Sequence, residues 1–189
     1  MRIIAGQYKG RIIGTVRDLS VRPATDRVRQ TVFDVLAHRM DLQGCAVLDL
    51  FAGSGSLGLE ALSRGAARVT FVESSEDAIA YLERNIRALG CGARTEIVPL
   101  DAMMYLGRTQ ARFDLVFADP PYRFAELATI PDIVFARKVL APEGFLLMEH
   151  TTDLRFESTA AYRIGPEKKF GRTLVTFFQS NPEQTNTSS

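Results

Sequence analysis

The sequence of 189 residues is poor in the residues that build metal and disulfide sites, with two cysteines and two histidines. Cys45 and Cys91 lie far apart and neither belongs to a C-x-x-C pair, so the sequence supports neither a zinc site nor a disulfide. We expect buried thiols and predict no metal ion. Ordinary surface or hydrogen-bonded side chains are the simpler interpretation of the histidines, His38 and His150.

Long apolar runs are also missing. No run approaches the length of a membrane span, and no signal-peptide core follows the charged residues at the N-terminus. We therefore expect a cytoplasmic protein. The hydrophobic content of 46% and charged content of 24% are typical of soluble globular proteins, and the length suits one α/β domain with a small addition.

The net charge is only +1, but it is unevenly distributed. Residues 1–29 carry seven basic and two acidic side chains, a net charge of +5, which leaves −4 for the other 160 residues. A basic segment on an acidic body suits a phosphate backbone, although a solvated basic surface would have the same composition. Tyr8 could add a stacking surface. The basic residues assigned to nucleic-acid contact are Arg2, Lys9, Arg11, Arg22 and Arg27.

Short apolar runs alternate with helical periodicity through most of the chain. Residues 2–14 predict a β-hairpin, and a helix is expected from Thr25 or Asp26 to about Arg39. The alternation that follows predicts a mostly parallel sheet with helices on both faces. The expected strands are 46–50, 68–72, 94–98, 113–118 and 144–149, and the expected helices are 56–64, 76–89, a short one after Asp101 and one near 131–140.

The end of the chain departs from this alternation. Residues 162–164 and 174–178 flank the segment GPEKKFGR and predict a hairpin, so the last strand of a seven-stranded sheet would run antiparallel to the others. This pattern divides the chain into an N-terminal extension of hairpin and helix (1–43), an α/β domain (44–179) and a disordered polar tail (180–189).

A glycine-rich turn follows the first of the parallel strands. The segment VLDLFAGSGSLGLEALSRGA, residues 47–66, ends a strand at Asp49 and enters a helix through a G-x-G-x-x-G pattern, which by itself suggests a dinucleotide site. Ligands of parallel sheets bind at the carboxyl ends of the strands, and burying unpaired carboxylates is costly. The acids at these ends predict a ligand with hydrogen-bond donors and positive charge; they are Asp49, Glu73, Asp101 and Asp119.

S-adenosylmethionine has these features: a sulfonium, an ammonium, two ribose hydroxyls and an adenine amino group. Glu73 lies 20 residues after Gly53, the spacing at which an acid accepts both ribose hydroxyls. Asp101 and Ala102 are placed to meet the adenine edge, while Phe51 either contacts the cofactor or packs in the core. A nicotinamide site would share the glycines and the ribose acid. The full set of expected cofactor contacts is Asp49, Phe51, Gly53, Gly55, Glu73, Asp101 and Ala102.

The segment Asp119-Pro120-Pro121-Tyr122 follows the strand FDLVFA and predicts a reaction at an amino group. The exocyclic amino nitrogen of a base is a poor nucleophile because its lone pair is delocalised into the ring. Asp119 and the Pro120 carbonyl can accept its two hydrogens and favour tetrahedral geometry. Consecutive prolines hold that carbonyl rigidly, and Tyr122 offers a face on which an extruded base can stack.

These two motifs resemble those of Rossmann-like, amino-directed methyltransferases. More narrowly, RIIAGQYKGR, RPATDRVRQTVFDVL and EKKFGRT resemble the RsmD family, which methylates N2 of a guanine in 16S ribosomal RNA; Ala24 stands where that family usually has Thr. The resemblance implies that residues 119–122 are catalytic, that the acids and glycines bind S-adenosylmethionine, and that the basic hairpin contacts RNA of the small ribosomal subunit or its assembly intermediate.

Other functions make different demands on the sequence. A nicotinamide dehydrogenase has no use for an Asp-Pro-Pro-Tyr turn, and a cytosine C5 methyltransferase would need a cysteine after proline, which neither Cys45 nor Cys91 provides. Adenine N6 methylation of DNA or RNA would use the same four residues, and a noncatalytic RNA-binding factor could keep the fold. Lys168 and Lys169, in the expected terminal turn, are either phosphate contacts or solubilising residues.

Overall fold

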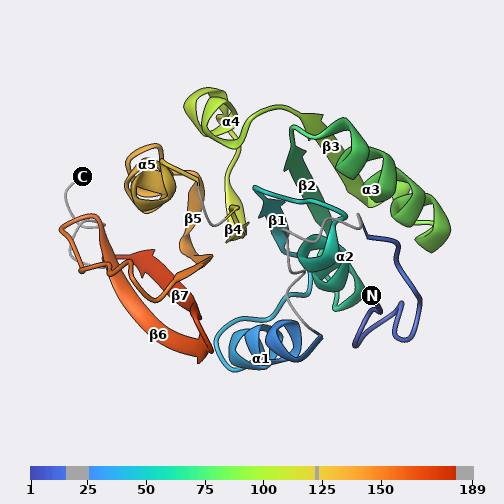
Figure 1. The fold of residues 1–189 in the computed structure, drawn as a ribbon, viewed down its shortest axis with the longest axis horizontal. Coiled ribbons are helices and arrows are strands. Elements are labelled where there is room, and N and C mark those ends of the chain that lie inside the picture. Colours follow the sequence, from blue (N-terminus) through green and yellow to red (C-terminus); the bar gives the residue numbers. More distant parts are fainter. Residues whose placement is uncertain (16–25, 122–123, 182–189) are drawn as a thin grey trace.

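The computed structural model describes residues 1–15, 26–121 and 124–181 and contains one mixed β-sheet with helices on both faces (Figure 1). Seven strands of the described chain pair in the order β3-β2-β1-β4-β5-β7-β6. The first five are parallel, and β7 is antiparallel to both β5 and β6. This is the Rossmann-like sheet with an antiparallel last strand that the sequence predicts, and its strands are β1 Ala46–Asp49, β2 Arg68–Glu73, β3 Thr95–Pro99, β4 Phe113–Ala118, β5 Leu140–Thr151, β6 Tyr162–Phe170 and β7 Thr173–Ser180.

Two hydrophobic clusters fix the helices on the two faces of this sheet. One cluster joins the inward side chains of α1, α2 and α3 to the N-terminal segment, and the other holds α4 and α5. Among the described residues, none of the helices is long and apolar enough to cross a membrane. The helices are α1 Asp26–Ala37, α2 Ser56–Ser63, α3 Glu76–Leu89, α4 Ala102–Arg108 and α5 Ile130–Ala136, with short 3-10 turns at Gly92–Arg94 and Leu127–Thr129.

The N-terminal segment forms a minimal hairpin that packs into the first cluster. A single antiparallel bridge joins Arg2 and Ile12, and the apolar side chains Ile3, Tyr8 and Ile13 are buried. The wholly buried carboxylate of Glu60 in α2 accepts hydrogen bonds from the N–H groups of Ile4 at 2.8 Å and Ala5 at 3.0 Å. The segment therefore shares the core of the sheet, and the expected stacking role of Tyr8 is wrong because its ring faces inward.

The last third of the chain differs from the sequence prediction in its element lengths. Helix α5 ends at Ala136 rather than near residue 140, because Lys138 adopts the left-handed conformation (φ 54°) and β5 begins at Leu140. Strand β6 continues through Phe170, since a shift of register between Ile164 and Glu167 lets the strand pass Pro166 and pair again with β7. Lys168 and Lys169 thus lie in a strand, and their expected place in a turn is wrong.

Candidate functional site

The glycine-rich turn lies between the end of β1 and the start of α2, at the carboxyl edge of the parallel strands. Gly53 and Gly55 adopt left-handed backbone conformations with φ values of 53° and 85°, which strongly favour glycine. A Cβ added at Gly53 would meet nothing within 4 Å, so this part of the turn faces open space, whereas one at Gly55 would lie 2.4 Å from Leu82. The turn therefore leaves open space at Gly53, where a ligand can approach the backbone closely.

Glu73, at the end of β2, holds this turn in place. Its Oε2 accepts the N–H of Gly53 at 2.8 Å, and its Oε1 accepts the N–H groups of Ser74 and Ser75 at 2.9 and 2.8 Å. The side chain is half-buried and lies directly beside the open side of the turn. The hydrogen bond to Gly53 thus brings the glycine-rich turn together with Glu73, which lies 20 residues further along the chain. The sequence predicts that both contact the same cofactor.

Asp49 is almost fully buried, with 1% of its surface exposed, behind the same turn. Its Oδ2 accepts the N–H of Gly58 in α2 at 3.0 Å. Burial raises the pKa of Asp49 to about 7; the Gly58 hydrogen bond opposes this change, and the negative charges of Asp119 and Glu73 add to it. A cation bound at the turn would favour the charged form of Asp49.

Asp101 caps α4 at the neighbouring strand end, after β3. Its Oδ1 accepts the N–H groups of Met103 and Met104 at 2.9 and 3.0 Å, which is the usual arrangement of an N-terminal helix cap. Ala102 is buried in the second hydrophobic cluster. Asp101 is half-buried, so it remains accessible to a ligand at this edge.

The Asp-Pro-Pro turn follows β4, next to β1 in the sheet. Asp119 is half-buried, Pro120 is buried and Pro121 is exposed, while Tyr122 lies outside the described residues. The N–H of Phe124 donates to the Pro121 carbonyl at 2.8 Å, and the Phe124 ring meets Phe51 of the glycine turn edge-on, with 5.1 Å between ring centroids. This aromatic pair ties the proline turn to the glycine turn.

A second carboxyl group, Glu149 near the end of β5, lies beside Asp119. Both residues line a small cavity of about 20 Å³, which is walled mainly by apolar side chains of α1, α2 and the sheet. Burial raises the pKa of Asp119 to about 6. Burial, followed by the negative charge of Asp119, raises the pKa of Glu149 to about 8. Sequence reasoning missed Glu149 because its proximity to Asp119 depends on the pairing of β4 with β5.

Two further residues of the site were also missed. Phe124 was not assigned a role, and its contact with Phe51 requires the fold to bring two loops together. Asn85 in α3 donates from Nδ2 to the carbonyls of Gly14 and Ser54, both at 2.9 Å, and accepts the N–H of Gly14 at 2.8 Å. It links the N-terminal segment to the glycine turn, and no local sequence pattern marks it.

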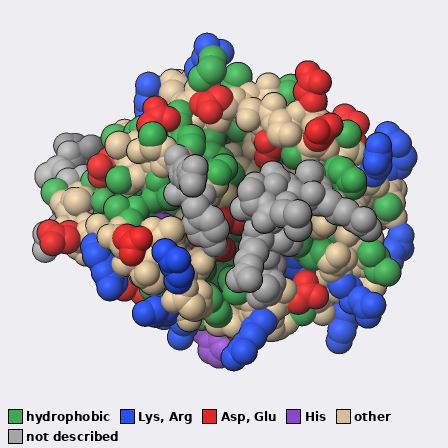
Figure 2. Space-filling view, in the orientation of Figure 1, with side chains coloured by type: hydrophobic (Ala, Val, Ile, Leu, Met, Phe, Trp, Pro, Cys, Tyr) green, Lys and Arg blue, Asp and Glu red, His purple; other side chains and the backbone are tan. Residues whose placement is uncertain are grey.

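The expected nucleic-acid residues form two groups in the structure. Arg2, Lys9, Arg11 and Arg27 are exposed on the N-terminal segment and α1, with Arg11 donating to the Ala88 carbonyl at 2.5 Å; Arg22 lies outside the described residues. Lys168 and Lys169 are exposed on β6 and, as successive strand residues, face opposite sides of the sheet. Figure 2 shows Lys and Arg side chains gathered along the lower edge of the molecule, near α1 and β6.

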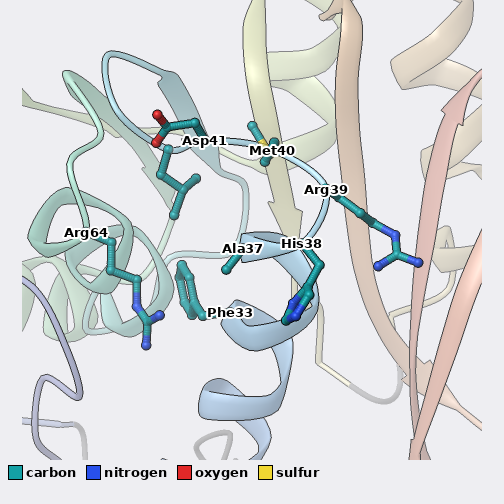
Figure 3. Close-up of a pocket in the computed structure, with 8 residues that line it drawn as sticks. Phe33, Ala37, His38, Arg39, Met40, Asp41 and Arg64 are labelled. Atoms are coloured by element: carbon teal, nitrogen blue, oxygen red, sulfur yellow. The ribbon is translucent and has the colours of Figure 1, made fainter.

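An open pocket of about 530 Å³ lies elsewhere in the described residues (Figure 3). It surrounds the C-terminal end of α1 and includes Arg64, which follows α2. Because α2 starts at the carboxyl edge of the strands, Arg64 lies toward their amino edge, away from Asp119 and the glycine turn. His38 of this pocket is exposed and its Nδ1 is 2.7 Å from the Asp34 carbonyl oxygen, whereas His150 is buried and its Nε2 is 2.8 Å from Thr176 Oγ1.

Comparisons with known proteins identify the family of the chain. Residues 1–179 match the family model described as Conserved hypothetical protein 95. The chain belongs to this family. It is 34% identical over 180 residues to ribosomal RNA small subunit methyltransferase D of Escherichia coli strain K12, covering 95% of this chain and 89% of that protein.

A second relative of the same name, from Haemophilus influenzae, is 32% identical over 183 residues. The match covers 95% of this chain and 94% of that protein. The solved structure named "Putative methyltransferase yhhF from Escherichia coli" superposes with a TM-score of 0.84 at 34% identity, over 96% of this chain and 98% of that one. The fold is thus that of Rossmann-like methyltransferases over nearly the whole chain.

Proposed function

We propose that this protein transfers a methyl group from S-adenosylmethionine to the exocyclic N2 of a guanine in 16S ribosomal RNA, as the RsmD family does. The observation that carries the proposal is the contact between Phe51 and Phe124, which brings the Asp119-Pro120-Pro121 turn beside the glycine turn. A methyl donor held at the glycine turn would then lie next to the groups that orient an amino nitrogen. The names of the relatives support ribosomal RNA of the small subunit as the substrate.

The residues at the strand ends fit S-adenosylmethionine. The open space beside Gly53 admits a ligand close to the backbone, and the carboxylates of Asp49 and Glu73 complement a cationic ligand with ribose hydroxyls. Phe51 offers a ring face at the same turn, and Asp101 with Ala102 lies where the adenine edge would come. When bound, this cofactor supplies an electrophilic methyl group on a sulfonium.

The proline turn supplies the acceptor side of the reaction. Asp119 and the Pro120 carbonyl accept the two hydrogens of the amino group and direct the nitrogen lone pair at the methyl carbon. As the nitrogen gains its new bond, the Asp119 carboxylate or a water molecule takes the proton that the nitrogen loses. We further propose that Tyr122 stacks on the extruded base and that Pro121 keeps the turn rigid.

We propose that the RNA binds on the side of the molecule where α1 packs against the sheet. Val175 of β7 pairs with Glu149 of β5 on one side and with Lys168 of β6 on the other, so Lys168 shares a row and a face with Glu149. Residues 1–43 would then contribute Arg2, Lys9, Arg11, Arg22 and Arg27 as further phosphate contacts, with residues 44–179 as the transferase domain.

This arrangement distinguishes the two lysines of β6. Lys168→Ala is expected to weaken binding to 16S ribosomal RNA severalfold and to reduce the salt dependence of binding, because one phosphate contact is lost. Lys169→Ala removes the same charge from the opposite face and serves as the matched control. Filter-binding titrations at several salt concentrations measure both effects, and equal losses in the two variants would remove Lys168 from the RNA path.

The function is tested by incubating the protein with labelled S-adenosylmethionine and small ribosomal subunits, or their assembly intermediates, from cells that lack the enzyme. The expected product after digestion is N2-methylguanosine. N6-methyladenosine would establish adenine methylation instead. RNA binding without methyl transfer to either substrate would indicate a noncatalytic factor.

A further inference from the structure

Glu149 has no role in the proposed methyl transfer, although its carboxyl group lies beside Asp119, which is proposed to orient the acceptor amino group. The parallel strands β4 and β5 pair in register from Leu115 to Ala118 of β4, with Ala118 opposite Met148. Asp119 directly follows the last residue of β4, and Glu149 is the next residue of β5. Neighbouring strands lie about 4.8 Å apart. The two carboxyl groups therefore start from adjacent positions of one row and reach the same cavity.

The size and lining of this cavity indicate what Glu149 can do. Its volume of about 20 Å³ is close to that of one water molecule and much too small for a nucleobase. Most of its wall is apolar, with Val28 and Val32 of α1, Leu57 of α2 and Val175 of β7. Glu149 is thus placed to interact with Asp119, directly or through one water molecule, rather than with the RNA base.

The charged groups around the cavity compensate the negative charge of the pair only in part. On the strand ends, Asp49 of β1 adds further negative charge near Asp119, and Glu73 of β2 adds negative charge near Asp49. From α1, the buried Arg29 lines the cavity. Its Nη2 donates to the Arg2 carbonyl at 2.5 Å and to Asp26 at 2.9 Å, while its Nε has no hydrogen-bond partner among the described residues. From β6, Lys168 is exposed two strands away from Glu149. Two ionised carboxylates would repel each other here, so one proton shared by the pair is the stable state.

We propose that Glu149 is a positioning residue whose protonated carboxyl group donates a hydrogen bond, directly or through one water molecule, to the Asp119 carboxylate and keeps it aimed at the acceptor amino group. The inference rests on the proposed methyl transfer. Burial raises the pKa of both carboxyl groups, and the negative charge of Asp119 raises the pKa of Glu149 further. Because Asp119 has to accept the hydrogens of the amino group, the proposal places the shared proton on Glu149 and leaves Asp119 ionised. Above about pH 8 Glu149 ionises, the hydrogen bond is lost, and repulsion turns the Asp119 carboxylate away.

The test is the pH profile of the methyl-transfer rate at saturating cofactor and RNA. The wild-type rate is expected to fall about fivefold between pH 8 and pH 9, because the protonated fraction of a group with a pKa of about 8 falls by that factor. Glu149→Gln keeps a side-chain donor that does not titrate, so its rate at pH 7 stays near wild type and the alkaline fall is absent. Glu149→Leu has no donor and is expected to lose about 10- to 100-fold at pH 7, the usual effect of removing a hydrogen bond to a charged group.

Glu143→Gln on the exposed start of β5 is the matched control and keeps the wild-type profile. An unchanged alkaline fall in Glu149→Gln would overturn the proposal, because the titrating group would then lie elsewhere. A wild-type protein that methylates no RNA would instead contradict the proposed function, so the two failures are distinguishable.

Carbon-13 NMR titration of the side-chain carboxyl groups provides a measurement that needs neither cofactor nor RNA. Glu149 is expected to titrate above pH 7 in the wild-type protein and at lower pH in Asp119→Asn, where the neighbouring charge is gone. Titration of Glu149 near the ordinary glutamate value of about 4.3 would rule out the shared proton.

Discussion

Asp119→Ala is expected to lower the methyl-transfer rate at least about 100-fold while S-adenosylmethionine still binds, the loss typical of removing a group that stabilises a transition state by hydrogen bonding. The alanine leaves the amino group with only the Pro120 carbonyl as acceptor, so its lone pair is no longer directed at the methyl carbon. The glycine turn keeps its own contacts, because Glu73 and Asp49 bind it through the N–H groups of Gly53 and Gly58.

Single-turnover rates with saturating RNA, together with calorimetric titration of the cofactor, separate these two effects. Asp34→Ala, on the exposed face of α1, is the control for loss of one surface carboxylate. Asp119→Asn keeps one acceptor oxygen and is expected to fall between the wild type and alanine. A wild-type rate in Asp119→Ala would remove Asp119 from the reaction, and loss of cofactor binding would assign it to the cofactor site instead.

Local sequence signals predicted those parts of the fold that local interactions determine. Helix α3 has the predicted bounds because Ser75 caps its first turn and Gly90 ends it in the left-handed conformation. The glycine turn and Glu73 were likewise identified by their spacing, and the structure brings them together. Strand β6 was predicted too short because Pro166 normally interrupts a strand, whereas a register shift at this position allows pairing to resume.

The parts that the sequence did not predict depend on contacts between distant segments. No local pattern distinguishes Glu149 from the other acidic residues, because its position beside Asp119 depends on the pairing of β5 with β4. The role of Asn85 likewise depends on the packing of α3 against the glycine turn. Tyr8 is surrounded by charged residues in the sequence, yet its ring is buried and its hydroxyl accepts a hydrogen bond from Arg94 at 2.6 Å. Each of these outcomes follows from strand order and helix packing rather than from composition.

Asp49→Asn is expected to make the protein more stable at pH 8 and to weaken cofactor binding strongly. Burial raises the pKa of Asp49 in the folded protein from 3.8 to about 7, so the folded state retains a proton that the unfolded chain releases. Folded protein therefore binds more protons than unfolded protein between about pH 4 and pH 7, and stability decreases as the pH rises through that range. At about 1.4 kcal/mol per pKa unit, the cost of ionised Asp49 at pH 8 is up to about 4 kcal/mol.

Asparagine at residue 49 removes this cost because its amide does not ionise, while its side-chain oxygen can still accept the N–H of Gly58. Urea unfolding at pH 5 and pH 8 should therefore show a gain in the free energy of unfolding mainly at pH 8. Asp41→Asn, an exposed aspartate that accepts the N–H of Gln43 at 2.9 Å, is the control for exchanging a carboxylate for an amide.

The same substitution removes the negative charge that faces a cationic cofactor, so the dissociation constant for S-adenosylmethionine should rise at least about tenfold, the effect of losing one favourable charged contact. If Asp49→Asn and the wild-type protein have the same free energy of unfolding at pH 8, Asp49 is not held protonated in the wild-type protein. A gain in stability with unchanged cofactor affinity would limit Asp49 to holding the glycine turn. Both effects together would show that a buried carboxylate is kept at this strand end, against the stability of the empty protein, because the bound cation requires it.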